Sequence, residues 1–204
     1  MTASPVPSTL DLDAILADRW ADPTVFSAAE YARAEQFWHQ RRNHDERLLR
    51  LRSQAAQMIR DWTGRPSRDV GSFGLQLNLE SSDLDLGIGY PVAARDRLLA
   101  ALAPHTQFKG ERKTRFSTSR LVFSFEVEDV EVDLSALTEE DFAVSCRMLG
   151  EIESTMTEPE RVAHTWVKHL LRNAGRMEDY AVWKLCTYAR FCPEFNWVPI
   201  PEKA

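Results

Sequence analysis

GSFGLQLNLESSDLDL, residues 71–86, is the stretch that decides how the rest of the chain is interpreted. Asp83 and Asp85 close it, separated by one leucine. Because alternate side chains of a β-strand share a face, we expect the two aspartates to point the same way, with leucines packed behind them. Such a carboxylate pair suits a hard divalent cation such as Mg²⁺. The opening pair, Gly71 and Ser72, can offer backbone N–H groups and a hydroxyl to an anion, so the stretch indicates chemistry on nucleotides.

Length and composition are typical of an intracellular enzyme. The chain has 204 residues, which suits one domain with a small helical appendage, and 44% of them are hydrophobic. No apolar run approaches the ~20 residues that a membrane span needs, and the first residues do not have the pattern of a signal peptide. Cys146, Cys186 and Cys192 lack CxxC spacing, so we expect structural thiols in a reducing compartment and no zinc site. The prediction is a cytoplasmic protein with no membrane partner.

The formal net charge of −6 is unevenly distributed along the chain. Residues 126–160 carry twelve acidic residues against one arginine, whereas residues 41–68 carry eight arginines against three acidic residues. A basic surface can therefore coexist with an acidic one, and the total charge does not exclude a nucleic-acid partner. The arginines of 41–68 are more typical of a solvated helix face than of an RNA track. A second basic group either borders a cleft or forms a polar loop. It consists of Lys109, Arg112, Lys113 and Arg115.

Capping and breaking residues divide the chain into segments. Ser27 and Glu30 form a capping-box signature that opens a helical stretch, with a break near 43–45, and Gly64 ends it. Thr138 and Thr157 cap later helices. The predicted segments are an N-terminal arm at 1–26, a helical segment at 27–64, a core at 65–150, a second helical segment at 151–192 and an irregular tail at 193–204.

VEVDL, residues 130–134, contains the third candidate aspartate, Asp133. An aspartate in a strand is ordinarily at a sheet edge or in a turn. Here it follows a hairpin whose other arm is strongly apolar, which predicts a central strand and a functional reason for burying an acid. Three convergent carboxylates on two strands can hold two metal ions about 4 Å apart.

This combination resembles the DNA polymerase β-like nucleotidyltransferase superfamily, in which an apolar residue, Gly-Ser, a spacer and Asp-x-Asp precede a third aspartate on a later strand. The wording SSDLDL is most similar to non-canonical poly(A) polymerases, terminal uridylyltransferases and their bacterial relatives. The resemblance implies an α+β fold, with a mixed β-sheet catalytic core at 65–150 flanked by N-terminal and C-terminal helices. It also implies an enzyme in which Asp83, Asp85 and Asp133 bind Mg²⁺ or Mn²⁺.

The resemblance extends to the nucleotide-binding residues. The helix at 161–173 is similar to the family helix whose lysine reaches the triphosphate, which makes Lys168 the candidate; a solvated lysine is the alternative. Tyr180 resembles a family tyrosine that contacts the nucleotide, although its place on an apolar helix face favours core packing over base stacking. Asp179 stands where serine is usual, and Gln76 stands where relatives have a second glycine, so the triphosphate cradle, with Gly71 and Ser72, is expected to differ in shape.

The implied reaction is transfer of an NMP from an NTP to an acceptor hydroxyl, with release of pyrophosphate. An RNA 3′ end is favoured as acceptor by the motif wording and the local basic stretches. A small-molecule or protein hydroxyl is favoured by the compact size and overall acidity. A non-catalytic NTP-binding or partner-binding module is the third alternative, with Gln76 as a sign of decay.

Overall fold

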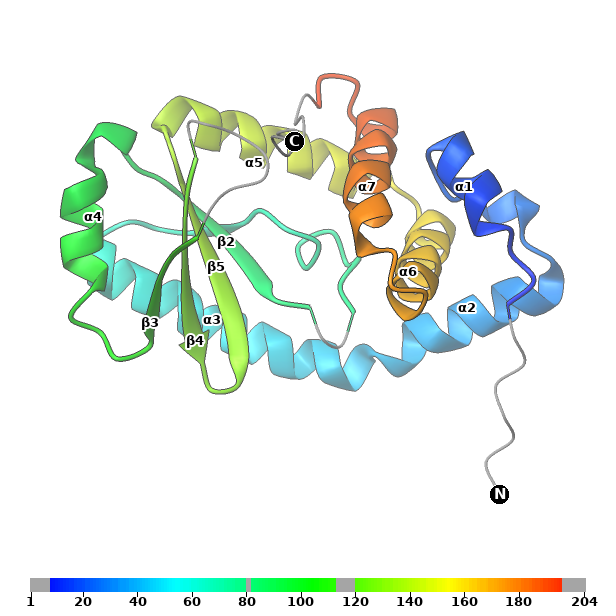
Figure 1. Cartoon of the computed structure of the whole chain (residues 1–204), viewed down its shortest axis with the longest axis horizontal. Helices are drawn as coiled ribbons and strands as arrows, with labels where there is room; N and C mark the ends of the chain where they lie inside the picture. The colour runs from blue at the N-terminus through cyan, green and yellow to red at the C-terminus, as the bar shows by residue number, and fades with distance from the viewer. Residues whose placement is uncertain (1–7, 80–81, 113–119, 196–204) are drawn as a thin grey trace.

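The computed structural model describes residues 8–79, 82–112 and 120–195, and its strands form one mixed sheet (Figure 1). Within these residues the strand order is β1-β2-β5-β4-β3, with β2 and β5 parallel and the other neighbours antiparallel. The bounds are β1 Arg68–Asp69, β2 Leu84–Gly89, β3 Phe108–Arg112, β4 Leu121–Val127 and β5 Val130–Leu137. The strand that carries Asp133 is therefore central, as the sequence predicted.

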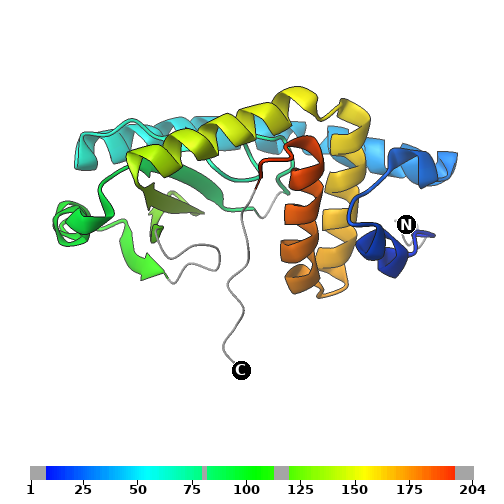
Figure 2. The same cartoon turned by 90° about the horizontal axis from the view of Figure 1, so that it is seen from above.

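Helices cover both faces of the sheet, and a group of helices lies beyond one end of it (Figures 1 and 2). The α-helices are α1 Leu12–Asp18, α2 Ala28–Gln40, α3 Arg42–Thr63, α4 Arg95–Leu102, α5 Glu139–Thr155, α6 Glu158–Asn173 and α7 Met177–Phe191. Two 3₁₀ turns lie at Pro23–Val25 and Val92–Ala94. The mixed sheet with flanking N-terminal and C-terminal helices confirms the predicted α+β fold.

The strands have one apolar face, which buries the main core. Leu84, Leu86 and Ile88 of β2 pack with Leu51 of α3 and Leu98 of α4 in one buried cluster. Because strand side chains alternate, Asp85 points to the opposite face. On that face α5 packs against the glycine end of β2, where a Cβ on Gly87 would lie 3.3 Å from the Phe142 ring. Strand β2 is thus held by packing on both sides of the sheet.

Side-chain caps set where the helices begin. Ser27 accepts a hydrogen bond from the Glu30 amide, Thr138 accepts one from the Asp141 amide at 3.0 Å, and Thr157 forms a capping box with Glu160. The predicted break in the first long helical stretch occurs at Arg41 and not at 43–45. The side chain of Arg41 turns inward at this point.

The N-terminal segment packs on the helical end of the molecule. The carboxylate of Glu30, a buried residue of α2, accepts hydrogen bonds from the Ser8 hydroxyl and the Trp166 indole, both at 2.7 Å. The Trp183 indole donates to the Ile15 carbonyl at 3.2 Å. These contacts tie the N-terminal arm to α2, α6 and α7. Among the described helices, none has the length and apolar character that crossing a bilayer requires.

Candidate active site

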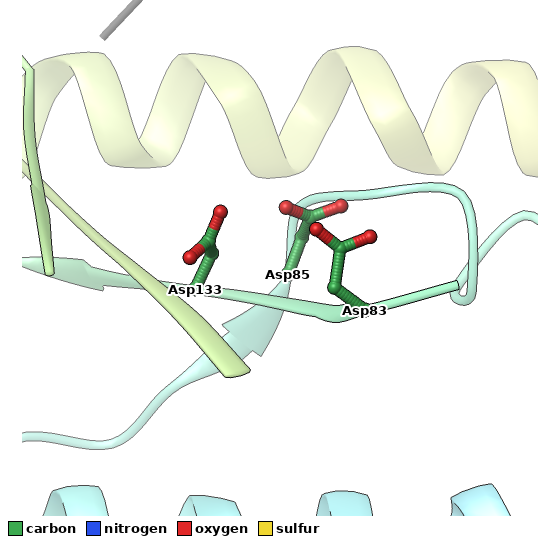
Figure 3. Close-up of side chains that lie close together, drawn as sticks. All are labelled: Asp83, Asp85 and Asp133. Carbon is green, nitrogen blue, oxygen red and sulfur yellow. The ribbon is translucent and has the colours of Figure 1, made fainter. Parts of the chain in front are cut away.

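Three carboxylates converge at the polar face of β2 and β5 (Figure 3). Asp85 and Asp133 are register partners in the parallel β2–β5 pair, and Asp83 immediately precedes β2. One oxygen from each of the three lies within 4.8 Å of the others. The two-residue spacing puts Asp83 and Asp85 on one side of the chain, and the parallel register brings Asp133 beside them. The structure therefore brings together the three aspartates that the sequence singled out.

Burial and nearby negative charge make two of these carboxylates, those of Asp85 and Asp133, harder to ionise. Burial raises the pKa of Asp85, and the negative charge of Asp83 raises it further. Burial also raises the pKa of Asp133, to about 6, against the opposing effect of the Arg112 guanidinium. A cation placed between the three groups would favour their ionised forms.

Arg112 on β3 contacts the third aspartate directly. Its Nη1 lies 3.1 Å from Oδ1 and 3.2 Å from Oδ2 of Asp133, and its Nη2 lies 2.7 Å from the Glu131 carboxylate. The basic group was expected either to border a cleft or to form a polar loop. Arg112 lies at the border of the site. Lys113 and Arg115 lie outside the described residues.

Gly71 sits against the half-buried Asp85. A Cβ built on Gly71 would lie 2.0 Å from Oδ2 of Asp85, so no other residue fits without a shift of the loop or of the carboxylate. The loop that follows is closed by hydrogen bonds from the Leu77 amide to the Ser72 carbonyl and from the Gln76 amide to the Phe73 carbonyl, at 2.8 and 2.9 Å. The Gly-Ser turn and the carboxylates are consequently in direct contact.

Gln76 has a left-handed backbone, with φ of 61°. This is the conformation that glycine adopts most readily, which gives a physical reason for a glycine at this position in the relatives that the sequence resembles. This chain has glutamine at position 76 where the relatives have glycine, but the backbone at this position still has the left-handed conformation that suits glycine.

Lys168 on α6 reaches the Gly-Ser loop from the helical side. Its Nζ donates to the Leu77 carbonyl at 3.0 Å and lies 3.2 Å from Ser72 Oγ and 3.4 Å from Ser82 Oγ. The residue is 4% exposed, and burial lowers its pKa to about 7, with the nearby charge of Lys184 the next cause. Lys168 is thus directed at the site and does not lie on a solvated helix face.

Tyr180 lies in the core behind Lys168. It is 4% exposed, its hydroxyl is 3.3 Å from Nε2 of His164, and Lys168 Nζ is 5.4 Å from its ring centroid. This position favours the packing role over base stacking. Asp179, at the position where relatives have serine, pairs with Arg176 at 2.6 Å.

Sequence reasoning missed Lys184 and Arg120. Lys184 Nζ lies 5.9 Å from the Tyr180 ring centroid, and Arg120 donates to Ser135 Oγ at 2.9 Å. The charges of Lys184 and Arg120 both lower the pKa of Asp85 and so oppose the effect of its burial. The spacing of Lys184, one helical turn after Tyr180, is a signal that could have identified it.

The fold and the three-aspartate site define a class: the chain has the fold of the DNA polymerase β-like nucleotidyltransferases, which confirms the resemblance seen in the motifs at the level of the fold. It is similar to the structure of the GLD-2/RNP-8 complex, with 16% identity and a TM-score of 0.53 over 83% of this chain and 68% of that one. It is also similar to a cytoplasmic RNA terminal U-transferase, with 11% identity and a TM-score of 0.51 over 70% of this chain and 45% of that one. No protein-family model and no curated protein sequence matches the chain.

Proposed function

We propose that this protein is a metal-dependent nucleotidyltransferase that moves an NMP from an NTP to an acceptor hydroxyl and releases pyrophosphate. One observation carries the proposal: the carboxylates of Asp83, Asp85 and Asp133 converge within 4.8 Å, and Gly71 of the phosphate-binding type of turn lies directly against Asp85. The fold shared with the GLD-2 and terminal U-transferase structures supports the same reaction class.

The donor set fits a hard divalent cation. Three carboxylates offer only oxygen ligands, which Mg²⁺ and Mn²⁺ prefer. The raised pKa values of Asp85 and Asp133 are those of acids that gain from a nearby positive charge. Asp83, Asp85 and Asp133 would hold the ions, which when bound supply charge neutralisation and activation of the attacking oxygen.

The residues of the turn and of α6 would bind the phosphates. The Gly71 amide, the Ser72 hydroxyl and the Lys168 ammonium would hold the terminal phosphates, and Lys168 Nζ is already 3.2 Å from Ser72 Oγ. In the reaction the acceptor oxygen bonds to the α-phosphorus, and the bond from the α-phosphorus to the oxygen that bridges to the β-phosphate breaks. Pyrophosphate leaves with that oxygen, and the hydroxyl proton passes to water. Asp133 would favour deprotonation of the acceptor. Catalysis then depends mainly on positioning and on neutralising charge.

An RNA 3′ end is the acceptor that we propose. The similar U-transferase is described as acting on RNA, and the sequence motif points to the same class. The charges of the described residues limit how many RNA phosphates the protein can contact, because much of the arginine-rich stretch is paired within the protein. Arg50 contacts Glu128 at 2.6 Å and Arg52 contacts Asp69 at 2.8 Å. We therefore propose an RNA held by few phosphate contacts.

A small-molecule or protein hydroxyl is the second candidate acceptor, and the same pairing favours it. The contacts between basic and acidic side chains continue beside the site, where Lys109 pairs with Glu126 at 2.8 Å and Arg112 pairs with Glu131 and Asp133. Pyrophosphate release should be measured with each NTP and a divalent metal, with total RNA and without it. Release that requires RNA supports the first acceptor, whereas release stimulated equally by RNA-free extract supports the second.

Asp133→Asn tests the reaction itself. We expect turnover to fall by at least about 10²–10³-fold, because the substitution removes a charge at the centre of the site while keeping its shape. Nucleotide binding should be largely retained, since the turn and Lys168 are unchanged. Full turnover in this variant would refute the assignment. NTP binding by the wild type without pyrophosphate release under any condition would favour the non-catalytic module.

A further inference from the structure

Arg41 occupies the single residue between α2 and α3, and its side chain points into the protein. It is 7% exposed, and its guanidinium carbon lies 5.1 Å from the centroid of the Trp38 ring. A buried guanidinium requires hydrogen-bond acceptors in fixed positions, because burial of an unsatisfied charge is costly. The hydrogen-bond acceptors of Arg41 show which segment of the chain its side chain fixes.

The guanidinium of Arg41 holds the backbone of residues 76–78. We call this segment the strip; it belongs to the Gly-Ser loop, which begins at Gly71 and Ser72. Nη2 donates to the Gln76 carbonyl at 2.5 Å, and Nη1 donates to the Asn78 carbonyl at 2.6 Å and lies 3.2 Å from Asn78 Oδ1. The carbonyl between them, that of Leu77, accepts instead from Lys168 Nζ at 3.0 Å. Three consecutive carbonyls are therefore shared between two cations, one from the α2–α3 junction and one from α6.

We infer that Arg41 is a positioning residue for the phosphate-binding half of the site, an inference that rests on the proposed function. By fixing the carbonyls of Gln76 and Asn78, it fixes the carbonyl of Leu77 that orients Lys168. Lys168 in turn lies beside Ser72. Arg41 itself is part of the wall behind the loop, and its effect on a triphosphate passes through Lys168 and Ser72.

Two features of the loop explain why this support is needed. Gln76 holds a left-handed backbone, which a non-glycine residue adopts only when its surroundings enforce it. A cavity of about 370 Å³ also lies beside the strip, lined among others by Trp38, Phe73 and Asn78. Leu77 packs into the core, but close packing is incomplete on the side of the cavity, where hydrogen bonds from the guanidinium hold the Gln76 and Asn78 carbonyls.

The test compares Arg41→Lys and Arg41→Ala with Arg47→Ala as a matched control. A lysine keeps the positive charge but cannot span two carbonyls with a planar fork. Arg47 is also an arginine of this helical region, but it pairs with Asp129 at the β4–β5 turn, away from the Gly-Ser loop. Binding of inorganic triphosphate in the presence of Mg²⁺ is measured by calorimetry for each protein, together with the thermal unfolding midpoint, the KM for NTP and kcat.

We expect Arg41→Lys to weaken triphosphate binding about tenfold, which corresponds to about 1.4 kcal/mol. The KM for NTP should rise by a similar factor, with a much smaller change in kcat, because Lys168 contacts the phosphates both before and during the reaction. Arg41→Ala should have a larger effect, and Arg47→Ala none. A merely structural role would lower the unfolding midpoint of Arg41→Lys while leaving triphosphate affinity and KM unchanged.

The outcomes separate this inference from the proposed function. Equal triphosphate affinity in the wild type and Arg41→Lys overturns the role of Arg41, whatever the activity, and so does a wild type that binds no triphosphate. Weakened binding in Arg41→Lys, together with a wild type that releases no pyrophosphate from any NTP, supports the role of Arg41 and overturns the transferase assignment.

Discussion

Gly71 shows how much of the site depends on the absence of one side chain. The Asp85 carboxylate packs where a Cβ of residue 71 would lie, so the Gly-Ser turn and the carboxylates can be adjacent in this way only if this residue has no Cβ. A glycine chosen for turn flexibility alone would tolerate alanine when its φ is negative. The contact with Asp85 makes this position stricter than its backbone angles require.

Gly71→Ala should therefore impair both stability and turnover. A Cβ 2.0 Å from Asp85 Oδ2 must displace the loop or the carboxylate. We expect a loss of about 1–3 kcal/mol in the free energy of unfolding and a loss of turnover larger than that destabilisation explains. Thermal unfolding and pyrophosphate release measure the two effects. Gly150→Ala on α5 is the control: nothing lies within 4 Å of its Cβ, and we expect a gain of about 0.5–1 kcal/mol. Normal turnover in Gly71→Ala would contradict the close contact.

The raised pKa of Asp133 predicts that the proposed metal binding depends on pH. Its pKa is raised to about 6, mainly by burial, and a proton competes with a metal ion for the carboxylate. We expect Mg²⁺ affinity to be nearly constant above pH 7 and to fall as the pH is lowered through 6, as measured by calorimetric titration between pH 5 and 8. In Asp133→Asn this part of the pH dependence should disappear. Equal Mg²⁺ affinity at pH 5 and pH 7.5 in the wild type would be the contrary result.

The same shift has a defined effect on the stability of the metal-free protein. Between about pH 4 and 6 the folded state holds a proton on Asp133 that the unfolded state has lost. The free energy of unfolding contributed by this group therefore falls as the pH rises through that window. Bound Mg²⁺ should offset this loss at neutral pH.

At the scale of helices and strands, local signals predicted the fold well. The alternation of apolar residues in β4 and β5 reflects one buried face. Thr138 marks a helix start because its oxygen accepts from an amide that lacks a helical partner, and Thr157 marks one because its own amide and hydroxyl donate to the Glu160 carboxylate. Asp133 was predictable as part of the site because an acid within an apolar central strand needs a specific partner.

Other elements could not be predicted because their causes lie far away in the sequence. The segment Phe108–Arg112 is polar and contains Gly110, yet it forms the edge strand β3 by pairing with β4. The α2–α3 break falls at Arg41, whose hydrogen-bond acceptors lie in the distant loop at 76–78. Lys184 lies on α7, where the apolar residues predict a helix face that packs in the core. In each case tertiary contacts override what the local pattern favours.

Across the whole molecule, opposite charges from distant segments neutralise one another. The arginine-rich α3 meets the acidic β4–β5 turn through Arg50 and Glu128, and Arg65 meets Glu139 at the start of α5 at 2.7 Å. The uneven charge along the sequence is thus evened out in part by folding. The described arginines of residues 41–68 therefore do not form a long, continuous basic surface.

RNA affinity should consequently depend only weakly on salt. For single strands the slope of log K against log salt is about −0.7 per phosphate contact. We expect a slope shallower than about −2, measured from RNA binding between low and physiological salt at constant Mg²⁺. A slope steeper than about −4 would show that at least six phosphates are contacted, and would contradict the idea of an RNA held mainly near its 3′ end.

The parallel pairing of β2 with β5 has a consequence for the order of events as the chain folds. Asp85 and Asp133 become neighbours only after the whole crossover between them, including α4 and the β3–β4 pair, has formed, and Lys168 comes later still along the chain. Contacts between such distant residues are slow to form. A nascent chain emerging from the ribosome therefore exposes β2 before its partner β5 has been made. Any ligand that needs Asp85, Asp133 and Lys168 together can protect only the finished domain from proteolysis.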